Sequence, residues 1–90
     1  MKAFNRTNRL GLRYTLIELV NNKTQIQLQV NPEMQKSIIV DHPIVLLERS
    51  WENWKNGDLL QAAFPFLTAT EREFILTGIS DAEWDELFKD

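Results

Sequence analysis

Polar and apolar side chains alternate strictly from Gln25 to Val30, with three glutamines on one side and Ile26, Leu28 and Val30 on the other. A period of two residues indicates a β-strand with one face in water. Residues 13–20 are rich in strand-forming residues and predict a second strand. The Asn-Asn-Lys-Thr stretch between them is typical of a turn, because asparagine tolerates positive φ. The pattern therefore predicts an antiparallel hairpin.

Pro32 interrupts this pattern, because proline cannot donate a hydrogen bond to a sheet. With Asn31 before it, Pro32 could begin a short helical turn. Residues 36–40 are then predicted to form a third strand. A helix through residues 33–40 is the alternative interpretation.

After residue 43 the period of the apolar residues becomes helical. Spacings of three, four and three residues place four apolar side chains on one helix face: Ile44, Leu47, Trp51 and Trp54. Gly57 follows where a left-handed residue would end this helix. Asp58 is expected to cap a short helix over residues 59–64, which Pro65 ends.

Two capping boxes predict further helices near the C-terminus. Thr68 and Glu71 have the Ser/Thr-x-x-Glu spacing that opens a helix, and Gly78 lies where a left-handed residue would close it. Ser80 and Glu83 repeat the spacing and predict another helix through residue 88.

These patterns predict an α+β domain, with an antiparallel hairpin or three-stranded sheet over residues 13–40 and three or four short helices over residues 42–89. Residues 1–12 are polar and basic, and we expect them to form an arm outside the single domain of residues 13–90. The predicted core combines inward positions of both parts: Leu16, Leu19, Ile26, Leu28, Val30, Leu47, Trp51, Phe64, Leu67, Phe74, Ile79, Trp84 and Leu87.

Composition narrows the class of protein. The 90 residues make one small domain, and the absence of cysteine excludes disulfides and thiolate metal sites. No apolar run reaches the ~18–20 residues that cross a bilayer, and no apolar leader follows the N-terminus. We therefore expect a cytoplasmic protein without a membrane partner.

Residues 54–88 carry several short motifs in a fixed order. Gly57 is followed by Gln-x-x-Phe-Pro at residues 61–65, Arg-Glu-Phe at residues 72–74, Thr-Gly and finally Trp-Asp at residues 84–85. This block resembles a group of small, uncharacterised proteins encoded by bacteriophages and related mobile elements. The resemblance covers under half of the chain. It implies a phage setting inside a host cell, and it brings no activity and no catalytic residue.

Residues that could carry catalysis are scarce. The single histidine, His42, lies between Asp41 and Pro43 in a predicted break. No phosphate loop, Gly-x-Ser-x-Gly or His-Glu-x-x-His motif occurs. The acidic residues at 81–86 are expected to form a solvated helix face rather than a metal site. The sequence therefore predicts a protein that is not an enzyme, with no catalytic residue, metal or cofactor.

Binding to another protein is the leading hypothesis. Seven of the nine aromatic residues lie between residues 51 and 88, in a region whose last third is strongly acidic. An exposed aromatic side chain within such a surface is typical of an interface hot spot, and Trp54 and Phe66 are expected to be exposed. The predicted partner-binding residues are Trp54, Phe66, Glu83, Asp85 and Glu86. A protein of this kind could inhibit or redirect a host factor.

Two alternatives remain open. The N-terminal region could bind nucleic acid, with its arginines on phosphates and its tyrosine stacked on a base, through Arg6, Arg9, Arg13 and Tyr14. The net charge of −3 argues against this alternative. The basic N-terminal region of one copy could also meet the acidic C-terminal region of the next, or hairpins could pair edge to edge, so that the protein assembles into an oligomer.

Overall fold

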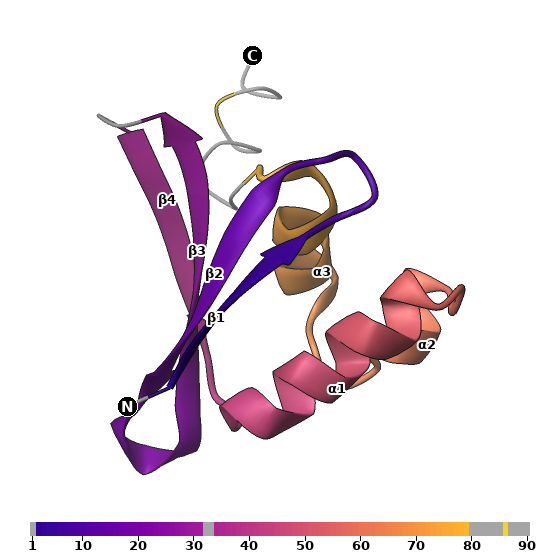
Figure 1. Ribbon diagram of the computed structural model, residues 1–90, viewed down its shortest axis with the longest axis horizontal. Coiled ribbons are helices and arrows are strands. Elements are labelled where there is room, and N and C mark those ends of the chain that lie inside the picture. Colours follow the sequence, from indigo (N-terminus) through magenta and orange to yellow (C-terminus); the bar gives the residue numbers. More distant parts are fainter. Residues whose placement is uncertain (1, 32–33, 80–85, 87–90) are drawn as a thin grey trace.

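The computed structural model describes residues 2–31, 34–79 and 86 of the chain. It confirms the α+β class, with a four-stranded antiparallel sheet followed by three short helices in the described part (Figure 1). The strands lie in chain order across the sheet: β1 (Ala3–Thr7), β2 (Arg13–Leu19), β3 (Lys23–Asn31) and β4 (Met34–Val40). The helices are α1 (Ile44–Lys55), α2 (Leu60–Ala63) and α3 (Ala69–Thr77).

The predicted hairpin is formed by β2 and β3, and Leu16 pairs with Ile26 across it. Asn21 and Asn22 turn the chain with φ values of 63° and 58°, the left-handed conformation expected of asparagine at this point. β4 confirms the third strand predicted over residues 36–40, so the helical alternative for that stretch is wrong.

The sequence predicted that the N-terminal residues form an arm outside the domain, and this prediction is wrong. Ala3–Thr7 form strand β1 at the edge of the sheet. Phe4 pairs with Leu16, and Arg6 pairs with Tyr14. Both Phe4 and Arg6 occupy the half-buried positions of the strand. A cation at an inward position breaks the apolar alternation by which a strand is recognised, and this is why the pattern did not predict β1.

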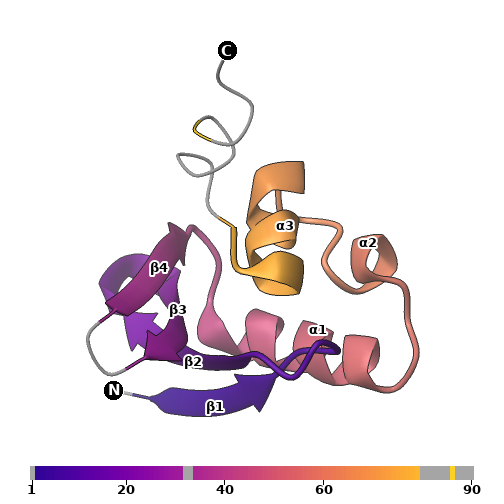
Figure 2. The same ribbon diagram turned by 90° about the horizontal axis from the view of Figure 1, so that it is seen from above.

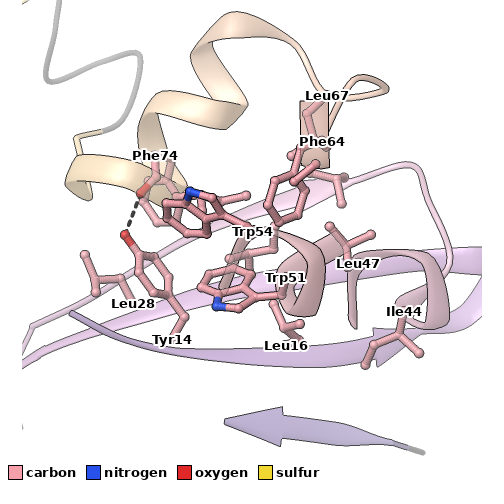
Figure 3. Packing of buried hydrophobic residues seen from close by; sticks show 14 residues of the cluster. Tyr14, Leu16, Leu28, Ile44, Leu47, Trp51, Trp54, Phe64, Leu67 and Phe74 are labelled. Carbon is pink, nitrogen blue, oxygen red and sulfur yellow. Dashed lines mark hydrogen bonds between the residues drawn. The ribbon is translucent and has the colours of Figure 1, made fainter. Parts of the chain in front are cut away.

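Figure 2 shows that the three helices gather on one face of the sheet. The core lies between this face and the helices, with Trp51 and Trp54 of α1 at its centre (Figure 3). Eight predicted core residues are buried: Leu16, Ile26, Leu28, Leu47, Trp51, Phe64, Leu67 and Phe74. Leu19 and Ile79 are only partly buried.

Three predicted core positions lie outside what the structure describes: the side chain of Val30, and Trp84 and Leu87. The second capping box, at residues 80–83, also lies outside the described residues.

The first capping box is confirmed. Thr68 Oγ1 accepts a hydrogen bond from Glu71 N at 3.1 Å, and Glu71 Oε1 accepts one from Thr68 N at 2.9 Å. Gly78 ends α3 in the left-handed conformation, with φ of 77° and its N–H donating to Phe74 O. The cap expected at Asp58 is wrong, because α2 begins at Leu60 without a side-chain cap.

Candidate binding surfaces

The loop between β1 and β2 holds the C-terminal end of α3 through one side chain, Asn8. Its Nδ2 donates to Ile75 O at 2.9 Å and to Leu76 O at 3.0 Å. Its Oδ1 accepts from the N–H groups of Leu10 and Leu12, both at 2.9 Å. Carbonyls at a helix C-terminus have no partner within the helix. Asn8 therefore joins the N-terminal hairpin to α3.

Arg9 makes the corresponding contact with α1. Its Nη2 donates to Trp54 O at 2.8 Å and to Asp58 O at 2.7 Å, and its guanidinium lies 5.4 Å from the Trp54 ring centroid. A cation at a helix C-terminus is favoured by the helix dipole. The nucleic-acid alternative placed Arg9 on a phosphate, whereas the structure engages its guanidinium within the fold.

The side chain of Arg6 also contacts α1 rather than extending into solvent. It forms ion pairs with Glu48 at 3.2 Å and with Glu52 at 3.8 Å, and its Nη1 donates to Asn5 O. Its Nε is buried and has no hydrogen-bond partner among the residues that the structure describes. The charge of Arg6 is therefore largely balanced by two carboxylates of α1.

Tyr14 is buried, at 1% exposure, and its hydroxyl donates to Phe74 O at 2.7 Å (Figure 3). Its ring packs against Trp51 and Phe74. Burial raises the pKa of the Tyr14 phenol well above its ordinary value, and the nearby Asn8 amide offsets only a smaller part of that rise. The stacking of Tyr14 on a nucleic-acid base, as the sequence suggested, is contradicted by this burial.

A cavity of about 660 Å³ brings several of these residues together with others that the sequence analysis did not single out. Its wall combines strands β1, β2 and β3 with α1, and its charged and aromatic members are Arg6, Arg13, Tyr14, Trp51, Glu52 and Lys55. Arg13 and Lys55 are exposed, and neither forms an ion pair with any residue that the structure describes. Three of the four residues of the nucleic-acid alternative thus line one cavity.

The exposure predicted for Trp54 is wrong. Trp54 is 1% exposed, and its ring packs 5.7 Å from Trp51 and 6.1 Å from Phe64, centroid to centroid. The chain reverses after α1, so that α2 packs against α1 (Figure 2) and Phe64 lies beside Trp54. Phe66 is half-buried and lies against His42, with ring centroids 4.7 Å apart.

The acidic part of the predicted surface is described at one position only. Glu86 is exposed, whereas Glu83 and Asp85 lie outside the described residues. Over residues 2–31, 34–79 and 86, no three acidic, histidine or cysteine side chains are grouped as a metal site would require. Within the same residues no helix has both the length and the apolar character needed to cross a bilayer.

The free edge of β1 is covered by side chains. Asn8 N donates to Leu12 O, and Glu18 N donates to Lys2 O, so the backbone groups of even-numbered residues face β2. The carbonyls of Asn5 and Thr7 point away from β2. The first accepts a bond from Arg6 Nη1 at 2.8 Å, and the second accepts one from Trp51 Nε1 at 3.1 Å.

The free edge of β4 differs from that of β1. Hydrogen-bonded and non-hydrogen-bonded residues alternate along each strand, and the register carries this alternation from β1 to β4. The backbone groups of Ile26 and Ile38 therefore bond to each other, whereas those of Ser37 and Ile39 point away from the sheet. Within the described part of the chain, these outward groups meet no hydrogen-bond partner. Ser37 is exposed, and Ile39 is 59% exposed.

Comparison with known proteins identified no relative of this chain. The chain matches no protein-family model, no curated protein and no solved structure.

Proposed function

We propose that this chain is a non-enzymatic accessory protein of a bacteriophage or related mobile element, which acts in the host cytoplasm by binding another protein. The resemblance of residues 54–88 supports the phage setting. The observation that supports protein binding most directly is the free edge of β4, where the backbone groups of Ser37 and Ile39 are available.

Proteins generally blunt the edge strands of their sheets, because unpaired backbone groups attract other strands. Here β1 is blunted by Arg6 and Trp51, whereas β4 is not blunted by any described residue. An extended segment of a partner can add a strand to such an edge. In this mode the main chain of Ser37 and Ile39 supplies hydrogen bonds, and the exposed Ile39 side chain supplies an apolar contact.

In this proposal the acidic C-terminal residues attract the partner and do not form the main contact. These residues are Glu83, Asp85 and Glu86. Negative charge outside the contact raises the association rate with a basic partner more than it raises affinity. Phe66, half-buried beside His42, is the one predicted aromatic contact that keeps an accessible surface.

A single proline tests the edge. The N–H of Ser37 points away from β3, so Ser37→Pro removes an outward donor and leaves the hydrogen bonds between β3 and β4 in place. Ser37→Ala is the matched control, because it removes the hydroxyl and keeps the N–H. We expect a partner captured from host lysate to be retained by Ser37→Ala and lost with Ser37→Pro, while circular dichroism shows both variants folded.

The same capture distinguishes the two predicted surfaces. Retention of the partner by folded Ser37→Pro, together with its release by Glu83→Lys/Glu86→Lys, would assign binding to the acidic residues instead of β4. Retention by both variants would refute protein binding at either surface.

A further inference from the structure

We propose that the cavity between the N-terminal strands and α1 binds a phosphate group, held between Arg13 and Lys55, on a nucleotide or a nucleic-acid strand. This site lies apart from the β4 edge, because β1 and β4 are the opposite edges of the sheet. It also differs from the site suggested by the sequence, because Arg9 does not line it, and Tyr14, which does line it, is buried and offers no ring for a base to stack on.

The charge of the cavity favours an anion. Its lining contains three cations, Arg6, Arg13 and Lys55, against one carboxylate, Glu52. Arg6 is balanced by its two ion pairs, whereas Arg13 and Lys55 are exposed and form no ion pair with a described residue. Two unbalanced cations in the lining of one cavity match the charge of a phosphate, and the arginine fork fits two of its oxygens.

Neutral donors beside these cations suit the remaining phosphate oxygens. Asn5 Oδ1 accepts a bond from Thr15 Oγ1 at 3.1 Å, which directs the Asn5 amide group and leaves its Nδ2 as a donor. Asn5 and Thr7 line the cavity as donors, and Thr15, which also lines it, holds the Asn5 amide in place. A volume of about 660 Å³ lies within the ~300–1,000 Å³ range of sites that bind small molecules of nucleotide size.

The end of α1 would by itself oppose an anion, because a helix C-terminus carries partial negative charge. Lys55 is the last residue of α1. Arg9 offsets this effect, since its guanidinium donates to Trp54 O and Asp58 O at the same helix end. Because Arg9 balances the partial negative charge at this helix end, the ammonium of Lys55 can contact a phosphate in the cavity.

Amide and indole NMR spectra of the full chain, recorded at low salt, test the proposal. The probes are inorganic phosphate, ATP without metal and a short single-stranded oligonucleotide. We expect the resonances of cavity residues, including the Trp51 indole N–H, to shift as each probe is added. Arg13→Glu/Lys55→Glu should weaken binding at least about tenfold, because both phosphate contacts become repulsive.

Two controls separate a built site from general charge. Lys23→Glu/Arg49→Glu changes the net charge by the same amount at exposed positions outside this cavity and should alter affinity less than about twofold. Glu52→Gln removes the only carboxylate of the lining and should strengthen binding several-fold. Ser37→Pro should leave binding unchanged, so failure here and failure at the β4 edge can be told apart.

The probes also identify the source of the phosphate. A nucleic-acid strand is indicated if the oligonucleotide binds more tightly than ATP and loses affinity more steeply with salt, since each phosphate contact on a single strand adds about 0.7 to the slope. A free nucleotide is indicated if ATP binds as tightly as the oligonucleotide. Equal weakening by the two double charge reversals, or the absence of shifts at Trp51, would overturn the proposal.

Discussion

Replacing Asn8 tests whether the hairpin loop really holds α3. The Asn8→Ala variant loses four hydrogen bonds, two to the carbonyls of Ile75 and Leu76 and two to N–H groups of its own loop. Asn8 is only 6% exposed, so water replaces these bonds poorly. At ~0.5–1.5 kcal/mol of net stabilisation for each bond, the expected loss is about 2–6 kcal/mol. Small domains are stable by only ~5–15 kcal/mol, so this loss is a large fraction of the total.

Urea unfolding followed by tryptophan fluorescence measures the loss, with the exposed Asn5→Ala as a control that should change stability by less than about 0.5 kcal/mol. Asn8→Asp separates the two halves of the contact. Aspartate keeps the acceptor for the loop N–H groups but places a carboxylate oxygen against the α3 carbonyls. It should therefore destabilise at least as much as Asn8→Ala. Near-normal stability of Asn8→Asp would refute the reasoning, because the bonds to α3 would then contribute little.

Three further predictions concern single groups. Gly78→Ala should destabilise by about 1 kcal/mol more than Gly11→Ala in urea unfolding, since both glycines have positive φ but only at Gly78 would the new Cβ meet Leu28, at 2.5 Å. Tyr14 is the only tyrosine, so absorbance should show no phenol ionisation in the folded protein at pH 10–11. Because the tyrosine of the unfolded chain loses its proton at a lower pH, the free energy of unfolding should fall by ~1.4 kcal/mol per pH unit above about pH 10. The Tyr14→Phe variant should lack this fall. Thr68→Ala should lower the free energy of unfolding by ~1 kcal/mol through loss of the cap on α3.

Local signals in the sequence predicted the parts of the fold that local geometry decides. The asparagine turn, the apolar face of α1 and the Thr68 capping box each depend on residues within a few positions of one another, and all three are confirmed. The fold class followed from their order along the chain.

Features that depend on distant contacts were not predicted. β1 contains an inward arginine that is balanced by Glu48, 42 residues later, so no periodicity within the strand marks it. Trp54 is covered by Phe64, which returns over it after α2, and by Arg9 from the loop between β1 and β2. Likewise, Arg13 and Lys55 share one cavity only once α1 has packed beside the sheet.

The bond between Asn8 and Ile75 spans 67 residues, and this has a consequence for how the chain is made. A ribosome releases residues 3–12 before their partners in α3, because translation runs from the N-terminal to the C-terminal side of the chain. Contacts of such long sequence separation generally form late in folding. Substitutions at Asn8 or Arg9 should therefore accelerate unfolding more than they slow folding, so that contacts made late in folding set the lifetime of the folded protein.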